Sequence, residues 1–336
     1  MMLHNSFGVD LGSSVIKIYD HRKDTIIKEK NMIAIRRNGQ ILGIGNDAYE
    51  MFEKTPVDVK VQEPISNGKI GDVFQVEAIL HTILNRSGLS VGRRPVLYFA
   101  VPTGLTKIEK RAYYTVARRG KLRKCKIFLV DRPVLDAIAL GIPLNRTRGS
   151  MIINMGSQST EVSVIADGRV IISTLIPIGG GQFNDAIRSN IRKKNNLLVG
   201  IRTARRLKLA LADMDPQKKE GRKVMGMDCV NGIPRDGIVT SSTVNTAIME
   251  RTKQMAAEIR KVIQRIPPQI RANIKKEGIY LTGGSTRIPH MDKFLSKELD
   301  YSVQLSLYYD LCTVCGLKEL ITHPALHHFA YPVTKQ

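Results

Sequence analysis

One short pattern occurs twice in this chain, about half a chain apart, and it constrains the fold more than any other feature. The first copy spans residues 8–19 (GVDLGSSVIKIY) and the second spans residues 152–164 (IINMGSQSTEVSV). Each has an apolar strand, an Asp or Asn, a tight turn of glycine and small hydroxyl residues, and a second strand. Such a turn points backbone N–H groups and hydroxyls at one spot, which suits a phosphate. Two copies predict two similar domains that hold a polyphosphate between them.

A third glycine turn lies at residues 281–289 (LTGGSTRIP), after the strand-like segment 278–280 and before a helical pattern. Glycine at the end of a strand lets a flat ligand approach the backbone closely. Each turn on its own is typical of an ordinary β-turn. Three of them in this order and at this spacing indicate a nucleotide site, and they resemble the phosphate-1, phosphate-2 and adenosine motifs of the actin-like ATPase superfamily.

Within that superfamily the chain resembles MreB, the bacterial actin family that determines rod shape, over nearly its whole length. The phosphate motifs alone would not separate this family from chaperones or sugar kinases. The stretches that carry the resemblance are 45–51 with 54–56, 101–106 with 109–112, 137–143, and 191–200 before 202–204. The resemblance implies an α/β chain with the actin-like ATPase fold, in which two duplicated ribonuclease H-like domains flank a nucleotide cleft.

The resemblance also implies domain boundaries. The first domain would take residues 1–147 and a C-terminal helix in 316–336, with a small subdomain at about 33–69. The second domain would take residues 148–315, with a small subdomain at about 182–243. Within the latter, residues 217–232 are rich in glycine and charge, which indicates a mobile loop.

Apolar periodicity and turn signals predict the local structure. A capping box at 106–109 and the later Gly120 predict a helix over 107–119, and a long amphipathic pattern predicts another from 242 to about 265. Asp167 and Gly168 predict a hairpin between strands at 161–165 and 169–172. Further strands are expected at 14–19, 96–101, 126–130 and 151–154. Strands that alternate with helices indicate α/β architecture.

The resemblance assigns nucleotide contacts to the three turns, to a second glycine pair and to two lysines. The residues so assigned are Asp10, Gly12, Ser13, Ser14, Lys17, Asn154, Gly156, Ser157, Gln158, Ser159, Gly179, Gly180, Lys208, Gly283, Gly284, Ser285 and Arg287. ATP or ADP with Mg²⁺ is the implied cofactor, and Asp10 would hold the metal through water. Lys17 resembles the phosphate-contacting lysine of eukaryotic actin, and the alternative is a strand lysine that faces solvent. Arg287 would lie near adenine, as in the DnaK chaperone.

The catalytic position departs from the family pattern. The family holds Mg²⁺ with two acids and orients the attacking water with a Glu, and phosphoryl transfer depends on such positioning. Here the Glu position is Arg132, which cannot act as a base near neutral pH, and the second acid is replaced by Asn154. Asp131 is the possible substitute, although on an extended segment it would point elsewhere. The alternative role of Arg132 is a structural salt bridge to Asp131 or Asp136.

Other departures also replace acids by neutral or basic residues. Arg205 and Arg206 stand where the family has two Glu, and Tyr308 begins a Tyr-Tyr-Asp run where it has Asp-Asp-Pro. Cationic groups near a triphosphate favour nucleotide binding by Coulomb attraction, even as the affinity for Mg²⁺ falls. The sequence therefore predicts a nucleotide-binding protein that is at most a slow ATPase.

The charge balance is strongly basic, with 52 Lys and Arg against 30 Asp and Glu. Such a surface attracts anionic lipid headgroups, nucleic acid or acidic protein faces. Nucleic acid is the default partner for a pI near 10, but the chain has no Trp, only 5% aromatic residues, and basic runs without interleaved stacking residues. These features disfavour nucleic acid. The alternative to a specific partner is solvated charge spread over the surface.

The expected compartment is the cytoplasm, with the protein peripheral at the inner face of the cell membrane. No apolar run reaches the roughly 18 residues of a transmembrane helix, and the first strand begins too early for a signal peptide. Four cysteines without a secretion signal indicate a reducing environment. The lone pair Cys312 and Cys315 is interpreted as two small buried residues one turn apart rather than a redox or metal site.

The resemblance implies partners as well. Head-to-tail contacts between copies of the chain are heterologous and do not close, so filaments would follow. MreC, MreD, RodZ and the cell-wall synthesis machinery are the other implied partners. Membrane attachment would use the loop at 87–94, with Leu89 and Val91 as apolar anchors and two arginines on anionic lipid. The alternative is a plain surface loop.

Three other functions remain open at this point. One is a kinase or DnaK-like ATPase, against which Arg132 and Asn154 weigh, and a chaperone would also need a substrate-binding domain. Another is a nucleotide-binding scaffold that does not hydrolyse ATP and modulates another MreB. The last is a plasmid-segregation filament protein, which the MreB-specific stretches disfavour.

Overall fold

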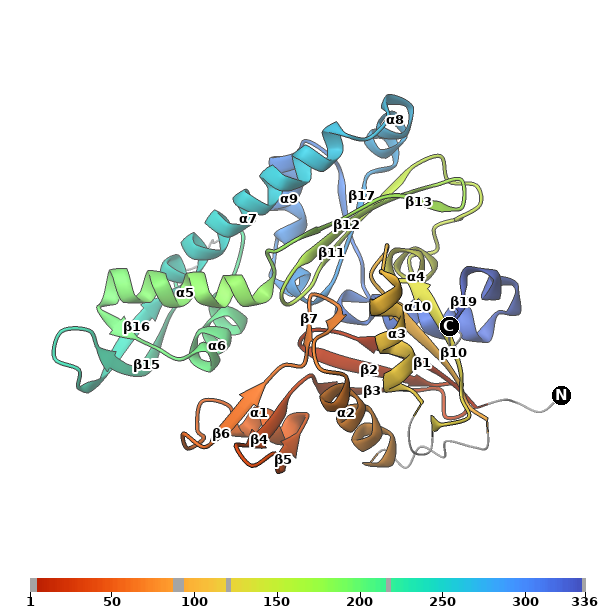
Figure 1. Ribbon diagram of the computed structural model, residues 1–336. Helices are drawn as coiled ribbons and strands as arrows, with labels where there is room; N and C mark the ends of the chain where they lie inside the picture. The colour runs from red at the N-terminus through yellow and green to blue at the C-terminus, as the bar shows by residue number, and fades with distance from the viewer. Residues whose placement is uncertain (1–4, 87–93, 119–121, 216–218, 334–336) are drawn as a thin grey trace. The chain divides into compact units, whose positions relative to one another are not determined.

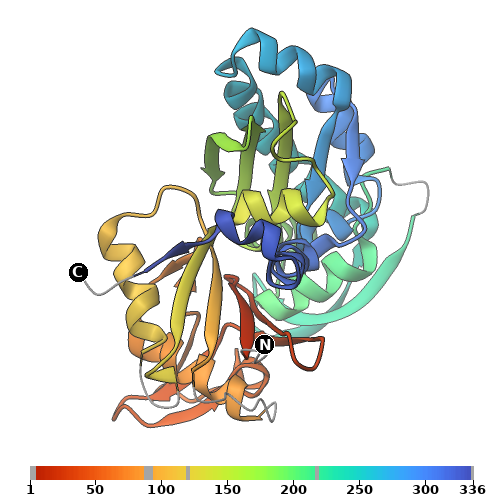
Figure 2. The ribbon, with the colours of Figure 1, turned by 90° about the vertical axis from the view of Figure 1, so that its right-hand side faces the viewer.

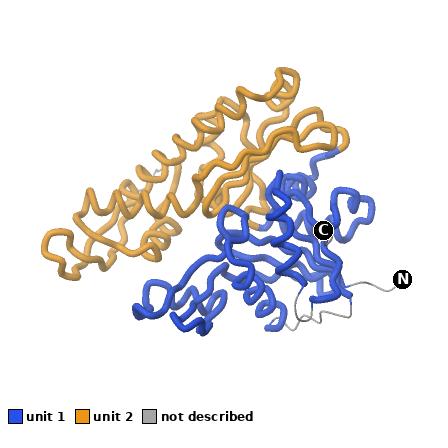
Figure 3. Tube along the Cα trace, in the orientation of Figure 1, with its two compact units in different colours: residues 1–144, 311–336 blue, residues 145–310 orange. Residues whose placement is uncertain are grey.

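The computed structural model describes residues 5–86, 94–118, 122–215 and 219–333, which fall into two compact units (Figure 3). Unit 1 takes residues 1–144 and 311–336, and unit 2 takes residues 145–310. The chain therefore leaves unit 1 once, completes unit 2, and returns to unit 1 for its C-terminal segment.

Unit 1 is built on a mixed sheet of six strands in the order β19-β10-β9-β1-β2-β3. These strands are β1 (Ser6–Leu11), β2 (Val15–Asp20), β3 (Thr25–Lys30), β9 (Val96–Val101), β10 (Lys126–Asp131) and β19 (Tyr331–Pro332). β1 is antiparallel to β2 and parallel to β9, and β10 continues the parallel part. β1 and β9 are buried along nearly their whole length, as expected for strands covered on both faces. Figure 2 shows the blue strand β19 beside β10.

Four of the described helices of unit 1 cover this sheet. They are α2 (Val73–Arg86), α3 (Lys107–Val116), α4 (Arg132–Ala139) and α10 (Cys312–Thr322). α10 packs on β1 and α4 through two glycines. A Cβ on Gly8 would lie 2.8 Å from Leu317 Cβ, and one on Gly316 would overlap the carbonyl of Leu135. On α10, Cys312 is buried and Cys315 is half-buried, one turn apart.

A small insertion in unit 1 has its own apolar core. It contains β4 (Ile33–Arg36), β5 (Ile41–Ile44), α1 (Asn46–Met51) and β6 (Val59–Gln62), and it is followed by a short hairpin of β7 (Ile65–Ser66) and β8 (Lys69–Ile70). Met32, Ala34, Ala48 and Val59 form the core of the insertion.

The sheet of unit 2 repeats the topology of unit 1. Its order is β13-β12-β11-β17-β18. The strands are β11 (Ser150–Met155), β12 (Thr160–Ala166), β13 (Arg169–Ile176), β17 (Ile279–Thr282) and β18 (Val303–Leu305). β11 is antiparallel to β12 and parallel to β17, just as β1 is antiparallel to β2 and parallel to β9. The duplication predicted from the repeated pattern is therefore confirmed.

Five α-helices are described in unit 2, together with a short 3₁₀ helix after β17. They are α5 (Gly180–Asn195), α6 (Ile201–Leu211), α7 (Ser241–Gln264), α8 (Pro268–Glu277), α9 (Met291–Leu299) and the 3₁₀ helix Gly284–Arg287. α5 and α7 run side by side (Figure 1), and their apolar faces join the sheet in one core that includes Ile153, Phe183 and Ile248. Within the described residues, no helix is both long and apolar enough to cross a bilayer.

The mobile loop predicted at 217–232 is largely wrong. Residues 221–228 form strand β15 (Gly221–Asp228), which pairs with β14 (Leu197–Leu198) and with β16 (Pro234–Thr240), whereas 216–218 lie outside the described residues. Charged residues suit this strand because the face that carries Lys223 is exposed, and glycine suits it because a Cβ on Gly226 would lie 2.6 Å from the carbonyl oxygen of Leu198. Glycine and charge therefore mark a sheet with one face exposed rather than a loop.

The C-terminal helix predicted at 316–336 is instead α10, which begins at Cys312 and ends at Thr322 and is followed by a 3₁₀ helix (Pro324–Phe329) and by β19. The strands and the other helices predicted from periodicity and turn signals are confirmed, with small shifts at their ends. The helix predicted at 107–119 ends at Val116, and its capping box has the expected form, since Thr106 Oγ1 accepts the N–H of Glu109 and the Glu109 carboxylate accepts the N–H of Thr106. Glu109 also binds Lys69 at 2.8 Å. The hydrogen bond from Lys69 and those from the backbone and hydroxyl of Thr106 lower the pKa of Glu109 to about 2.

Candidate phosphate and nucleotide sites

The first glycine turn joins β1 to β2, and several hydrogen bonds fix its shape. A Cβ on Gly12 would lie 2.5 Å from the carbonyl oxygen of Val15, so the turn requires glycine there. The buried amide of Asn31 donates to the carbonyl of Ser13 and to that of Ile65, both at 2.9 Å. The backbone N–H of Asn31 also donates to the carbonyl of Ser14. These hydrogen bonds of Asn31 therefore fix the backbone of the turn at residues 12–14, which we call the phosphate turn. The sequence analysis did not identify Asn31.

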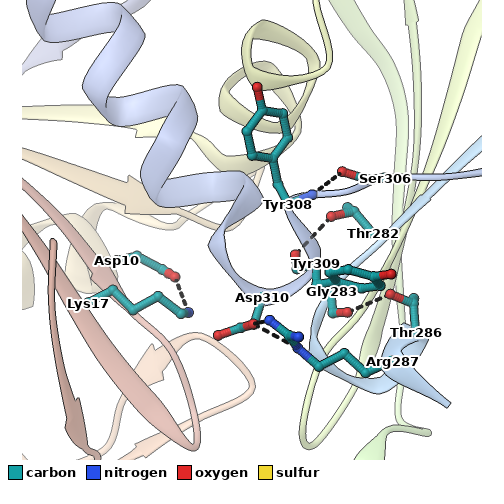
Figure 4. A network of polar contacts seen from close by, with 10 residues as sticks. All are labelled: Asp10, Lys17, Thr282, Gly283, Thr286, Arg287, Ser306, Tyr308, Tyr309 and Asp310. Carbon is teal, nitrogen blue, oxygen red and sulfur yellow. Dashed lines mark hydrogen bonds and ion pairs between the residues drawn. The ribbon is translucent and has the colours of Figure 1, made fainter.

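Asp10 and Lys17 form a buried ion pair beside this turn. They are opposite each other in the β1–β2 register, with 2.9 Å between Lys17 Nζ and Asp10 Oδ2 (Figure 4). Only 4% of Asp10 and 7% of Lys17 is exposed. The alternative in which Lys17 faces solvent is therefore wrong. A Cβ on Gly12 would lie 3.8 Å from Lys17 Nζ, so the ammonium is adjacent to the turn.

Arg132 lies against Gly68, a residue that is hydrogen-bonded to the same turn. It begins α4, and its guanidinium nitrogens lie 3.3 and 3.4 Å from the position of a Cβ on Gly68. Gly68 in turn donates its N–H to Ser13 Oγ at 3.4 Å and accepts the hydroxyl of Tyr113 at 2.9 Å. Burial raises the pKa of Tyr113; the nearby charge of Arg132 opposes this rise, whereas that of Asp10 adds to it.

The two acids considered near Arg132 have other contacts. Asp131 accepts the hydroxyl of Tyr331 at 3.1 Å, and burial followed by Asp131 raises the pKa of that tyrosine. Asp136 accepts the hydroxyl of Thr313 at 2.6 Å. The proposed ion pair of Arg132 with either acid stays a prediction, as does the role of Asp131 in positioning water.

In unit 2, three separate segments meet at the second glycine turn. The carbonyl of Gly156 accepts the N–H of Gly180 at 3.0 Å and the hydroxyl of Ser285 at 2.8 Å. The N–H of Gly181 donates to the carbonyl of Ser157 at 2.6 Å. A Cβ on Gly179 would lie 2.8 to 2.9 Å from backbone atoms of this turn, so glycine is needed for the close approach.

Lys208 reaches this cluster from α6. Its Nζ donates to the carbonyl of Gly180 at 2.7 Å. Burial lowers the pKa of Lys208 to about 8, and the neighbouring charge of Arg205 adds to the effect. The ammonium group of Lys208, whose pKa is close to physiological pH, therefore lies beside Gly180 and Ser285.

The third glycine turn is shaped by the strand next to it. Gly283 has φ of 102°, and a Cβ there would overlap the backbone of Met155 and lie 2.7 Å from Asn154 Oδ1. Its N–H donates to the carbonyl of Tyr309, and its carbonyl accepts the hydroxyl of Thr286 (Figure 4). Glycine at 283 is therefore required by the neighbouring backbone, a reason that the sequence analysis did not give.

Arg287 is held by two residues that sequence reasoning did not assign to the site. Its Nε and Nη2 donate to Asp310 Oδ1 at 3.1 and 2.7 Å, and its guanidinium lies 4.6 Å from the centre of the Tyr309 ring (Figure 4). Both residues belong to the Tyr-Tyr-Asp run noted as a departure from the family, which was the available signal. Nothing in the sequence marked Asn31.

Each unit thus brings together the assigned residues that it contains. Those of unit 1 are Asp10, Gly12, Ser13, Ser14 and Lys17, with Arg132 beside them. Those of unit 2 that meet through the contacts above are Asn154, Gly156, Ser157, Gly179, Gly180, Lys208, Gly283 and Ser285. Gln158, Ser159, Gly284 and Arg287 are their chain neighbours in the same turns. Nucleotide contact itself stays a prediction for all of them.

The donor groups do not fit the Mg²⁺ site that the family resemblance implies. Mg²⁺ demands oxygen ligands in near-octahedral geometry. The acid of the first turn, Asp10, is paired with an ammonium, and the second position carries the uncharged amide of Asn154. No three His, Cys, Asp or Glu side chains converge anywhere in the described part of the chain.

Residues 4–328 match the family model of the MreB/Mbl protein. The chain belongs to the MreB/Mbl family. Among its curated relatives, the cell shape-determining protein Mbl of Bacillus cereus is 29% identical over 318 residues, which cover 94% of this chain and 95% of the relative.

Solved structures of other family members and actin-like proteins have the same fold. MreB5 of Spiroplasma citri bound to ADP matches with a TM-score of 0.90 at 22% identity, over 97% of this chain and 98% of that one. The MamK double helical filament matches with a TM-score of 0.77 at 14% identity, over 95% and 99%. The predicted actin-like α/β fold is confirmed.

The predicted membrane loop cannot be placed in this fold. Residues 87–93, which include Leu89 and Val91, lie outside the described residues. Arg94, the last residue of that segment, is exposed.

Proposed function

We propose that this chain binds ATP or ADP and assembles into filaments that help to determine cell shape. The observation that carries the proposal is the convergence of the turns at Gly156, Gly180 and Ser285 with the cation of Lys208. Backbone groups, hydroxyls and a positive charge are what a nucleotide requires. The matching structure of MreB5 was solved with ADP, which supports the same ligand here. The turn of unit 1 carries groups of the same kinds around residues 12–14.

The finer parts of the proposal concern assembly and location. Filaments are supported by family membership and by the likeness to the MamK filament. We propose that they lie at the inner face of the membrane, attached by the basic surface, and guide cell-wall synthesis with MreC, MreD and RodZ. Hydrolysis would be weak because Arg132 and Asn154 replace the two acidic groups.

Two variants on one helix test nucleotide binding. Lys208→Met should weaken ADP binding by about 10- to 100-fold, because a charge-assisted hydrogen bond contributes about 1.5 to 3 kcal/mol. Arg206→Met removes an exposed charge two residues away and should leave the affinity unchanged. Titration calorimetry on the full chain measures both. Equal affinities for the two variants would contradict the placement of Lys208 at the nucleotide.

The same variants predict a pH dependence. Since the pKa of Lys208 is lowered to about 8, the side chain loses its charge as the pH rises through that value. ADP affinity of the unmodified protein should therefore fall between about pH 7 and 9, and Lys208→Met should remove that part of the fall. Identical pH profiles would contradict the assignment.

A second candidate function is a nucleotide-binding scaffold that does not hydrolyse ATP and modulates another MreB. Arg132 at the catalytic position favours it. Sedimentation and electron microscopy of the purified chain with ATP separate the two. Filaments of this chain alone support the first function, whereas sedimentation only together with a polymerising MreB supports the second.

A further inference from the structure

The phosphate turn of unit 1 carries two cations and one acid. Lys17 Nζ lies next to Gly12, and the guanidinium of Arg132 lies against Gly68, whose N–H is bonded to the hydroxyl of Ser13. Asp10 is the acid, and it is paired with Lys17 (Figure 4). Of these three side chains two are positive and one is negative, which suits an anion.

The same arrangement opposes a divalent cation. A metal ion that approached Asp10 would meet an ammonium 2.9 Å from the carboxylate oxygen, and Lys17 cannot move to solvent easily because it is only 7% exposed. Like charges at such short range repel strongly where water is excluded. The remaining cation, Arg132, stays charged at any physiological pH. Binding of Mg²⁺ at Asp10 is therefore disfavoured.

We propose that Lys17 and Arg132 replace the divalent metal, so that this chain binds its nucleotide phosphates directly and without Mg²⁺. The proposal rests on the nucleotide binding proposed above. An ammonium has three N–H donors, of which one is directed to Asp10, and a phosphate oxygen can accept another. The guanidinium of Arg132 offers a planar set of donors that matches phosphate oxygens. Together they supply two positive charges, the charge of the metal ion.

The decisive measurement compares ADP affinity with and without metal. Calorimetric titration of the full chain with ADP is carried out once with Mg²⁺ and once with EDTA. The two dissociation constants should agree within about twofold, which is less than the effect of one charge-assisted contact. Binding that requires Mg²⁺ overturns the proposal and leaves the nucleotide function intact. Absence of binding in both buffers overturns the nucleotide function, and this proposal with it.

Variants at Lys17 test whether this residue is responsible for ADP binding without Mg²⁺. Lys17→Met should weaken ADP binding in EDTA by about 10- to 100-fold, and Mg²⁺ should restore most of it because Asp10 is then unpaired. Lys17→Arg keeps the charge and should keep binding without metal. Lys28→Met is the matched control, since Lys28 is exposed and lies directly opposite Lys17 on β3. It should behave as the unmodified protein does.

The variants also have outcomes that overturn the proposal. Metal-free binding by Lys17→Met equal to that of Lys28→Met would show that Lys17 does not replace the metal. Circular dichroism and melting curves show whether Lys17→Met folds, because a buried Asp10 without its partner is costly. If it does not fold, the ADP affinities of the unmodified chain with Mg²⁺ and with EDTA still decide whether binding needs the metal.

Discussion

Two residues, Arg132 and Asn154, differ from the acidic residues of the family pattern and change the chemistry expected of the site. Arg132 stands at the start of α4 and Asn154 near the end of β11, both on backbone that keeps the family's architecture. A positive group cannot accept the proton of an attacking water, and an amide brings no charge to a metal ion. The fold is kept although two acidic groups are lost.

The first residue-scale prediction concerns hydrolysis. The double change Arg132→Glu with Asn154→Asp should raise phosphate release by at least about 100-fold, because loss of one preorganised catalytic group typically costs factors of about 100 to 1,000. Release is measured on purified protein under polymerising conditions with Mg²⁺ and ATP.

The opposite outcome is equally clear. An unmodified protein that hydrolyses ATP as fast as the double variant would show that the site is not degenerate. Asp131, or another acid, would then position the water, and its hydrogen bond with Tyr331 would have to open.

At the scale of elements, Gly316 allows helix α10 to pack closely on α4. Alanine normally replaces glycine in a helix with a gain of about 1 kcal/mol. At Gly316 the sign should reverse, because the added Cβ overlaps the carbonyl of Leu135 in α4. We expect Gly316→Ala to lower the free energy of unfolding by about 1–3 kcal/mol, the usual cost of overpacking.

Denaturant unfolding measures this effect against a second glycine. Gly284→Ala is the matched control, since its Cβ would lie 3.5 Å from Asp310 Cβ, an ordinary contact distance. It should change the unfolding free energy far less. A Gly316→Ala variant as stable as the unmodified chain would show that α10 can move off α4 without cost.

Local sequence patterns predicted most helices and strands. They failed where one pattern is compatible with two kinds of structure. The capping box at Thr106 and the turn at Asp167 each allow one structure, and both are confirmed. Glycine with charge at 221–228 fits both a loop and a strand with one exposed face, and only the pairing with β16 decides. The three turns were found because each is local. Asn31, Tyr309 and the hairpin at Gly68 act through contacts between distant segments, which no local pattern encodes.

At the scale of the whole molecule, the duplicated topology and the net charge of +22 are the main features. If the basic surface attaches the protein to a membrane, binding should depend on anionic lipid and on salt. Raising the salt from about 0.1 to 1 M shortens the Debye length from about 10 to 3 Å and should release the protein.

Sedimentation with vesicles tests this expectation. Binding to vesicles that contain phosphatidylglycerol should exceed binding to pure phosphatidylcholine and should fall as salt is raised. Equal binding to both lipids, unaffected by salt, would point to apolar anchoring instead.

The hairpin turn at Gly68 has a mechanical consequence. Its N–H is tied to Ser13, its carbonyl to Tyr113 in α3, and the next residue, Lys69, to Glu109 in the first turn of α3. The phosphate turn and α3 are thus connected through the contacts of Gly68 and Lys69. A displacement of Ser13 must either stretch these bonds or carry α3 with it. Ile108 is 83% exposed on α3. In the second case the surface around Ile108 would move with the turn at residues 12–14.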